Sequence, residues 1–303
     1  MIEIRLAQEG EISQQKELWK LCFGDEDSYI DFYFQNKYRK RETLLLLYNG
    51  KITSMLTMMP IRTILPNNRA YNSAMLYAIG THPDFRNYGF STELMAHSEK
   101  YLAAQGTVFS TLVPAENSLF DFYGKRGYKK SFFVKETLFP IHEIMELEIL
   151  CQYKVSISPT DPVEYIRRRS DILRQHFYIE YTIEQVEYQQ KLSRQSGADI
   201  YALDFEHHCN EINSIKGCAS VERIDKKRVI IKELLLPGEN LYIPVLKKLS
   251  RILTADEYLV RTPANLGKSL KGTAHPFGMI KALQKFDSEL LCAEQGYLGI
   301  AFD

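Results

Sequence analysis

The chain of 303 residues contains 38 Lys and Arg against 38 Asp and Glu, so its formal net charge is zero. A general nucleic-acid-binding protein usually shows a basic excess, and this balance therefore argues against a nucleic-acid partner. With 45% hydrophobic and 25% charged residues, the composition is that of a globular protein rather than a disordered one. The length suits one large domain or two of ordinary size.

Nothing in the sequence indicates a membrane or an exported protein. No apolar run reaches the roughly 20 residues that a membrane-spanning helix needs. The first five residues begin like a β-strand and not like a signal peptide. The cysteines form no C-x-x-C pair, which predicts reduced thiols in a cytoplasmic protein; they are Cys22, Cys151, Cys209, Cys218 and Cys292. The sequence leaves open whether the chain forms a homo-oligomer.

In the N-terminal half, hydrophobic periodicity and turn residues predict alternating strands and helices. The Asn49-Gly50 pair predicts a tight hairpin between two strands. The predicted strands are residues 2–6, 44–48, 51–64, 70–80, 107–113 and 128–139. The predicted helices are residues 13–22, 25–38 and 118–125, and one that follows the loop at 81–91 and lasts up to Gly106.

The pattern weakens around residues 140–160 and then resumes. A capping box formed by Thr182 and Gln185 predicts the start of a helix. The predicted helices are residues 163–177, 182–196 and 241–253, the predicted strands are 199–206, 215–224, 228–236 and 258–262, and the last forty or so residues are expected to be irregular. The same order of elements thus occurs twice. It predicts an α/β (α+β) fold of two tandem mixed-sheet domains, residues 1–140 and 155–303.

The segment most informative about function is the loop Arg86-Asn87-Tyr88-Gly89-Phe90-Ser91, between a predicted strand and a predicted helix. Small residues where a helix begins leave backbone N–H groups unpaired, and the helix dipole adds partial positive charge there. Together these features form a site for a pyrophosphate. Gly89 lets the backbone approach the phosphate and can supply a positive φ, and Arg86 adds charge. By spacing alone, the alternative is a solvated loop that starts an ordinary helix.

At these residues the chain resembles the GNAT superfamily of N-acetyltransferases, whose phosphate loop reads Q/R-x-x-G-x-G/A after the fourth strand. Arg86 and Gly89 match this pattern, and Ser91 replaces the final small residue. The resemblance extends to residues 117–128, which look like the family's short helix ending in Y-x-x-x-G-Y/F. It implies acetyl-CoA as the co-substrate, bound by Ile79, Gly80, Thr81, Arg86, Asn87, Tyr88, Gly89, Phe90, Ser91, Thr92, Asn117 and Ser118.

The whole chain is similar to the Eis-type (enhanced intracellular survival) acetyltransferases, which join an active N-terminal domain to a degenerate second copy. The second half carries Glu239 in the phosphate-loop slot, where a carboxylate would repel pyrophosphate. We therefore interpret this half as a degenerate GNAT-like domain that helps to shape the substrate cleft. The chain is too short for the third, sterol-carrier-like domain of many Eis-type enzymes, so their aminoglycoside and polyamine substrates are not carried over.

The resemblance also assigns roles in acetyl transfer to a primary amine of a small molecule or peptide. Two strands, residues 73–80 and 107–113, are expected to splay apart and hold the pantetheine arm. A backbone N–H of Ile79 or Thr81 would polarise the thioester carbonyl. Tyr123 matches the tyrosine that protonates the leaving thiolate, since a phenol of pKa about 10 lies close to a thiol near 8.5. The alternative is that Tyr123 is one more core aromatic.

Several alternatives stay open. The general base is not indicated, and Glu116, Asp27, His82 or an ordered water are the candidates. A metal site is not expected, because adjacent side chains in His207-His208-Cys209 point to opposite sides of a strand. The rival functions are a non-catalytic acyl-CoA sensor and a tRNA-dependent aminoacyltransferase. The neutral charge argues against the second.

The C-terminal run Gly296-Tyr297-Leu298-Gly299-Ile300-Ala301-Phe302-Asp303 is apolar, whereas most chains end in a frayed polar tail. This composition predicts a paired or buried tail. Eis-type enzymes use their terminal carboxylate in the active site, so the resemblance makes the carboxylates of Asp303 a candidate for attracting or deprotonating a cationic amine. The alternative is a last strand of the second domain, with Asp303 merely solvated.

Overall fold

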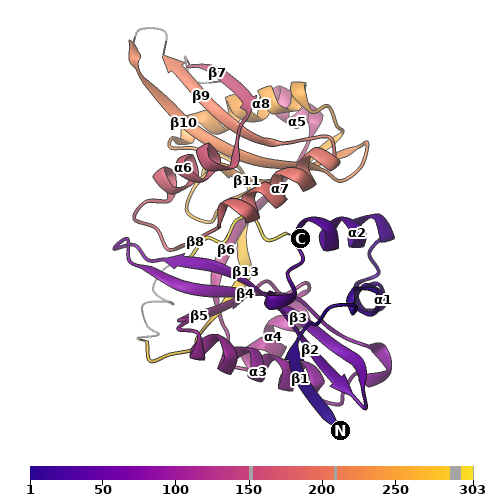
Figure 1. The fold of residues 1–303 in the computed structure, drawn as a ribbon. Helices are drawn as coiled ribbons and strands as arrows, with labels where there is room; N and C mark the ends of the chain where they lie inside the picture. Colours follow the sequence, from indigo (N-terminus) through magenta and orange to yellow (C-terminus); the bar gives the residue numbers. More distant parts are fainter. Residues whose placement is uncertain (150–152, 208–209, 287–294, 303) are drawn as a thin grey trace. The chain divides into compact units, whose positions relative to one another are not determined.

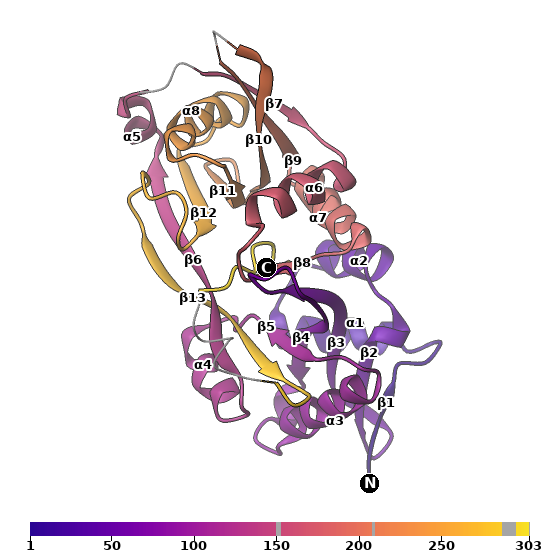
Figure 2. The same cartoon turned by 90° about the vertical axis from the view of Figure 1, so that its left-hand side faces the viewer.

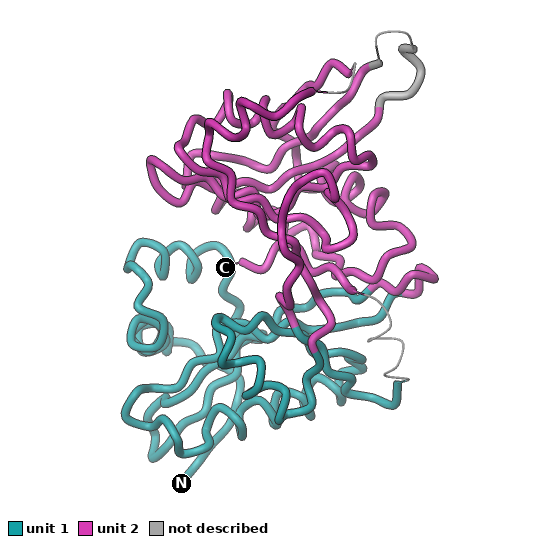
Figure 3. Tube along the Cα trace, turned by 180° about the vertical axis from the view of Figure 1, so that it is seen from behind, with its two compact units in different colours: residues 1–63, 70–129, 279–288 teal, residues 64–69, 130–278, 289–303 magenta. Residues whose placement is uncertain are grey.

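The computed structural model describes residues 1–149, 153–207, 210–286 and 295–302 (Figure 1). The chain divides into two compact units (Figure 3). Unit 1 comprises Met1–Thr63, Ala70–Lys129 and Met279–Ser288, and unit 2 comprises Ile64–Arg69, Lys130–Gly278 and Glu289–Asp303. Each unit has a mixed β-sheet with helices on both faces. In the described part of the chain, no helix is long and apolar enough to cross a membrane.

Unit 1 contains a sheet with the strand order β1-β2-β3-β4-β5-β13. The strands are β1 (Ile2–Leu6), β2 (Thr43–Tyr48), β3 (Lys51–Ile64), β4 (Ala70–Thr81), β5 (Phe109–Leu112) and β13 (Thr273–Ala282). The helices are α1 (Ile12–Phe23), α2 (Asp27–Asn36), α3 (Phe90–Ala104) and α4 (Asn117–Gly124), with short 3-10 turns η1 (Lys40–Glu42) and η2 (Pro83–Phe85). Asn49 and Gly50 have φ of 50° and 79°, which confirms the predicted hairpin turn.

Two helix layers cover the sheet of unit 1 (Figure 2). Leu94 and Met95 of α3 and Phe120 of α4 share one hydrophobic cluster with residues of β2, β3 and β4. On the opposite face, Trp19 of α1 packs on Tyr77 of β4. The strands can be covered on both sides because they are apolar nearly throughout, as in β2, where residues 43–47 are all buried.

Unit 2 contains a sheet with the strand order β6-β12-β11-β10-β9-β7. Its elements are β6 (Lys129–Pro140), α5 (Ile141–Glu146), β7 (Tyr153–Pro159), α6 (Pro162–Leu173), β8 (Tyr178–Glu180), α7 (Ile183–Gln195), β9 (Ile200–His207), β10 (Asn210–Arg223), β11 (Arg228–Leu235), η3 (Glu239–Leu241), α8 (Tyr242–Ile252) and β12 (Glu257–Pro263). The Thr182–Gln185 capping box is present at the start of α7, as predicted. The sequence did not predict α5, β7 or β8.

Each sheet contains a strand from the other half of the sequence. β6 follows α4 of unit 1 directly, yet it pairs antiparallel with β12 in unit 2, from Val134↔Pro263 to Pro140↔Glu257. β13 follows β12 in the chain, yet its last residues pair antiparallel with β5 in unit 1, from Met279↔Leu112 to Ala282↔Phe109. The expectation of an irregular C-terminal stretch was therefore wrong for residues 273–282. We call this arrangement the strand exchange.

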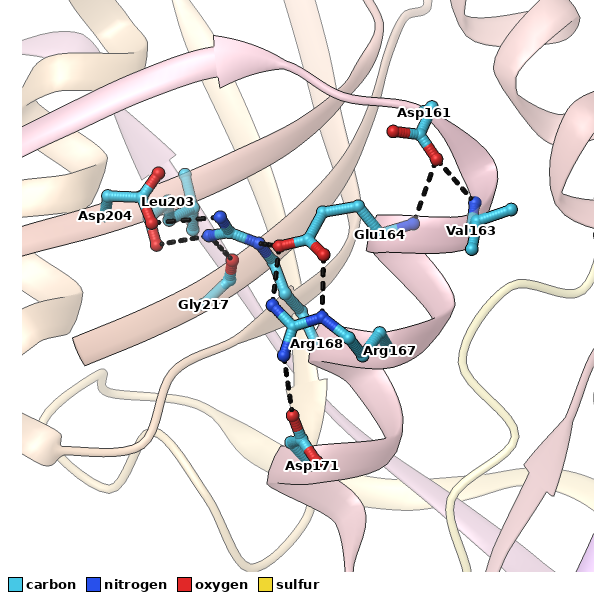
Figure 4. Close-up of polar contacts among 9 residues, drawn as sticks. All are labelled: Asp161, Val163, Glu164, Arg167, Arg168, Asp171, Leu203, Asp204 and Gly217. Carbon is cyan, nitrogen blue, oxygen red and sulfur yellow. Dashed lines mark hydrogen bonds and ion pairs between the residues drawn. The ribbon is translucent and has the colours of Figure 1, made fainter. Parts of the chain in front are cut away.

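The start of α6 is fixed to the sheet of unit 2 by an ionic network (Figure 4). Asp161 caps the helix by accepting from the backbone N–H of Val163 and Glu164 at 2.9 and 3.0 Å. Arg168 points from α6 to β9 and β10, where it donates to the backbone carbonyls of Leu203 and Gly217 at 3.0 and 3.2 Å.

Arg168 also forms an ion pair of 2.9 Å with Asp204. Glu164 accepts hydrogen bonds from Arg167 and Arg168. These bonds lower the pKa of the Glu164 carboxyl from 4.5 to about 2.

The C-terminal tail is buried in unit 2 over residues 297–302, which confirms the prediction of a buried apolar tail. Arg169 holds it by donating to the Leu298 carbonyl at 3.0 Å, and the Tyr181 hydroxyl donates to the Leu298 carbonyl at 3.2 Å and to that of Ile300. The Arg169 side chain in turn pairs with fully buried Glu233 at 3.0 Å. Asp303 lies outside the described residues.

Candidate functional site

β4 and β5 of unit 1 pair over a short stretch, after which β4 continues beside β3 without β5. Their parallel register runs from Ser73↔Phe109 to Met75↔Thr111, whereas β4 extends to Thr81. In the described structure, the later residues of β4 therefore have no partner on β5. Backbone groups left in this way can pair with an extended ligand as with an added strand. This is the separation that the family resemblance implied for these two strands.

The extended backbone of β4 is interrupted at Ala78, whose φ is 51°. A residue with a Cβ adopts this left-handed conformation at a cost of about 1–3 kcal/mol, so neighbouring contacts must maintain it. Buried Ser54 of β3 supplies such contacts: its hydroxyl donates to the Gly80 carbonyl at 2.7 Å and lies 2.8 Å from the Thr81 hydroxyl. The backbone of Ile79, Gly80 and Thr81 is thus fixed to the neighbouring strand.

The end of α1 packs directly on this part of β4. A Cβ built at Gly80 would lie 3.0 Å from the Cys22 sulfur and 3.3 Å from the Phe23 ring, so only glycine fits without a shift. Burial raises the pKa of the Cys22 thiol to about 11. The thiol therefore stays protonated at neutral pH and is a packing group rather than a nucleophile.

The predicted phosphate loop leads into α3 with its backbone open to solvent. Gly89 has a φ of 82° and Asn87 one of 69°, so the positive φ expected of Gly89 is present. No side chain caps the start of α3, and the first N–H groups of a helix have no acceptor within it. A Cβ at Gly89 would meet no heavy atom within 4 Å, so the loop has free space around it.

The loop residues differ in what they can offer a ligand. Phe90 is buried in the core beside Phe85, so only its backbone can take part. Tyr88 is 65% exposed. The remaining predicted residues of the loop and of the start of α4 lie at the surface or are half-buried: Arg86, Asn87, Ser91, Thr92, Asn117 and Ser118.

Tyr123 lies on α4 with its ring in the core and its hydroxyl uncommitted. The side chain is 7% exposed and packs edge-to-face on Phe122 and Tyr128. Among the described residues, none hydrogen-bonds to its hydroxyl. Burial raises the pKa of Tyr123 to about 12, and the nearby positive charge of Arg126 acts in the opposite direction. The phenol therefore keeps its proton at neutral pH.

Sequence reasoning missed Arg126, which joins α4 to the start of α3. Its guanidinium donates to the Thr92 hydroxyl through Nε at 3.1 Å and through Nη2, and Nη1 donates to the Phe122 carbonyl at 2.6 Å. Thr92 belongs to the first turn of α3. Arg126 stood inside the segment that carries the resemblance, but nothing in its spacing distinguished it from neighbouring Lys125. Ser54 and the φ of Ala78 gave no sequence signal either.

The candidates for a general base lie on different elements of unit 1. Asp27 is exposed and forms an ion pair of 2.8 Å with Lys20. His82 accepts from the backbone N–H of Asp84 through Nδ1 at 3.2 Å. Glu116 is exposed at the N-cap position of α4, where its side chain makes no capping bond.

The described part of the chain contains no group of three or more His, Cys, Asp or Glu able to hold a metal ion. The side chains of His207, His208 and Cys209 lie outside the described residues.

In unit 2, the segment that corresponds to the phosphate loop is bound to another loop of the same unit. Glu239 accepts the backbone N–H of Ser269 at 3.0 Å through its carboxylate, and the Ser269 hydroxyl donates to the Glu239 carbonyl at 3.0 Å. The carboxylate thus binds a backbone donor from another loop of the same unit.

Comparison with known proteins places these features in a family. Residues 3–131 match the family model of the acetyltransferase (GNAT) domain. No curated protein matches the chain significantly in sequence.

Solved structures resemble nearly the whole chain. A probable N-acyltransferase from Enterococcus faecalis has 14% identity and a TM-score of 0.72, covering 93% of this chain and 73% of its own. Eis1 from Mycobacterium abscessus has 10% identity and a TM-score of 0.66, with coverages of 93% and 74%. A tandem GNAT protein of the clavulanic acid biosynthesis pathway has 10% identity and a TM-score of 0.57, with coverages of 95% and 100%. Residues 3–131 are therefore similar to the acetyltransferase domain of the GNAT family, and the chain has the fold of Eis-like tandem GNAT proteins.

Proposed function

We propose that the chain is an acetyl-CoA-dependent N-acetyltransferase that acts on a primary amine of a small molecule or peptide. The observation that carries this proposal is the presence, within unit 1, of three features: an open helix start at α3, a stretch of β4 that extends beyond β5, and a protonated Tyr123. The first suits the pyrophosphate of CoA, the second its pantetheine arm and the third its thiolate. Residues 1–140 are the catalytic domain in this proposal, and residues 155–303 are a degenerate second copy.

The reaction is a direct transfer. The amine nitrogen attacks the acetyl carbonyl, the carbon–sulfur bond breaks, and the Tyr123 hydroxyl gives its proton to the leaving thiolate. A backbone N–H of Ile79 or Thr81 stabilises the oxyanion. The attacking amine must lose a proton to a base, for which Glu116, Asp27, His82, a water or the Asp303 carboxylates stay candidates.

The raised pKa of Tyr123 sets a requirement on this mechanism. If the transfer stands alone, a phenol with a pKa near 12 gives its proton to a thiolate, whose thiol has a pKa near 8.5, at a cost of roughly 5 kcal/mol. The cost is offset only if the proton that the amine gives up then reaches the phenolate and restores the phenol. The positive charge of Arg126 already favours the phenolate at this pKa.

A mass-shift screen tests the proposal. The protein is incubated with acetyl-CoA and pooled amines, including polyamines, amino acids, aminoglycosides and N-terminal peptides, and products heavier by one acetyl group are identified. Gly89→Glu is the control that should form none. CoA binding without turnover across the pool would instead favour an acyl-CoA sensor, and activity only with charged tRNA would favour an aminoacyltransferase.

A further inference from the structure

Arg126 is held in place by neutral groups, through a cation–π contact and hydrogen bonds. Its guanidinium lies 3.4 Å from the centroid of the Phe122 ring and donates to the carbonyl of the same residue. The two remaining contacts both go to one neutral acceptor, the Thr92 hydroxyl. In the part of the chain that the structure describes, Arg126 has no carboxylate partner. Such an arginine is oriented by packing while its strongest interaction, with an anion, is left unmade.

The location of Arg126 makes this arrangement costly without a ligand. Thr92 stands in the first turn of α3, so the guanidinium lies at the positive end of the helix dipole. A cation is disfavoured there by the same effect that favours an anion. Partial burial lowers the pKa of Arg126, which reflects the same lack of compensation. The exposed side chain of Arg86 adds a further positive charge to this loop.

We propose that Arg126 binds the pyrophosphate of the acyl donor and is a specificity-determining residue for CoA. This inference rests on the proposed function. A phosphate at the start of α3 replaces the Thr92 hydroxyl as acceptor for Nε and Nη2, the paired donors of one edge of the guanidinium. The bond from Nη1 to Phe122 and the stacking on its ring persist, so binding requires little reorganisation. Because Arg126 follows Tyr123 by three residues, one segment then holds both the phosphate and the proton donor.

Binding measurements on CoA fragments test the proposal without knowledge of the acceptor amine. The Kd values of CoA, 3′-dephospho-CoA and pantetheine are measured by calorimetry, or by competition where binding is weak. For Arg126→Gln, we expect the Kd of CoA and of 3′-dephospho-CoA to rise about tenfold or more, as for loss of a charge-assisted bond, and that of pantetheine to stay unchanged. Arg126→Lys keeps the positive charge but lacks the paired N–H donors of the guanidinium. Its Kd values for CoA and 3′-dephospho-CoA should therefore lie between those of the wild type and of Arg126→Gln. Lys125→Gln removes the adjacent exposed cation and should change none of these values.

Four outcomes would overturn the inference. In the first, Arg126→Gln raises the Kd of pantetheine as much as that of CoA, which indicates a merely structural role. In the second, it raises the Kd of CoA but not that of 3′-dephospho-CoA. In the third, Lys125→Gln raises the Kd of CoA as much as Arg126→Gln does, and in the fourth, Arg126→Gln changes none of the Kd values. If Arg126→Gln fails to fold, Arg126→Lys carries the same comparison. If the wild-type protein binds no CoA at all, the proposed function itself fails, and this result is separate from the other four.

Discussion

At the scale of single residues, the proposed mechanism makes the Tyr123 hydroxyl the proton donor to the leaving thiolate. We expect Tyr123→Phe to lower kcat by about 10²-fold or more while the Kd of acetyl-CoA stays nearly constant, because a proton donor acts mainly in the transition state. Steady-state kinetics and calorimetry give the two values. Tyr128→Phe is the control: it also removes a buried phenolic hydroxyl, one that is bonded to Ser110 at 2.7 Å, and should reduce stability more than kcat. An unchanged kcat in Tyr123→Phe, with chemistry rate-limiting, would exclude Tyr123 from the mechanism.

Gly89 tests the phosphate loop. We expect Gly89→Glu to abolish CoA binding, since the new carboxylate would lie where the pyrophosphate binds, and wild-type protein to bind one CoA per chain by calorimetry. Gly106→Glu is a closely matched control, because Gly106 follows the other end of α3 with a φ of 79° and equally free space. Two CoA molecules per chain, or normal binding by Gly89→Glu, would contradict the assignment of the site to unit 1.

What the sequence predicted about these residues follows from how local each property is. The positive φ of Gly89 could be predicted because a glycine before a helix is a local signal. The positive φ of Ala78 could not, since an alanine adopts it only under tertiary constraint from groups such as Ser54. Arg126 acquires its importance from Thr92, which lies 34 positions away.

At the scale of elements, the ionic network of α6 makes a prediction about pH. The pKa of Glu164 is about 2 in the folded protein against an ordinary 4.5. A carboxyl with a lowered pKa stabilises the fold above its unfolded value, and the contribution is lost as the pH falls from about 4.5 to about 2. We therefore expect Glu164→Gln to lower Tm at pH 7, with a difference from wild type that shrinks toward zero near pH 2.

The matched control for Glu164 is Glu187→Gln. Glu187 is an exposed carboxylate on α7 that forms no ion pair within the described residues. Thermal unfolding followed by circular dichroism across this pH range should show little difference between this control and wild type. A Tm difference for Glu164→Gln that persists undiminished at pH 2 would show that the network contributes packing rather than charge.

The elements themselves were predictable where their own sequence specifies them. β3 is predicted to the residue, because the Asn49-Gly50 turn starts it and the turn at Pro66 follows it. β13 was missed because Pro276 and Gly278 interrupt its pattern, and such residues argue against a strand. It forms because the edge of β5 offers backbone partners, a fact that no window of the sequence contains. β8, with three residues, is too short to show a period.

At the scale of the whole molecule, the strand exchange makes each sheet depend on both halves of the sequence. We expect a fragment of residues 1–140 to be poorly soluble and to unfold without cooperativity, because the edge of β5 loses its partner β13. A chain of residues 1–129 joined to residues 276–286 by a flexible linker restores that partner and should unfold cooperatively. Chemical denaturation followed by fluorescence of Trp19 compares them. A cooperative fragment 1–140 would show that β13 is dispensable.

The strand exchange also has a consequence for synthesis on the ribosome. Domains usually fold as they emerge, the N-terminal one first. Here β5 leaves the exit tunnel roughly 170 residues before the segment that pairs with it, which at 5–20 residues per second is an interval of about 10–30 s. During that time the strand Phe109-Ser110-Thr111-Leu112 presents an unpaired apolar edge in every nascent chain. Neighbouring chains on one polysome share this exposed edge, so the rate of translation between residues 112 and 282 sets how long they remain liable to aggregate.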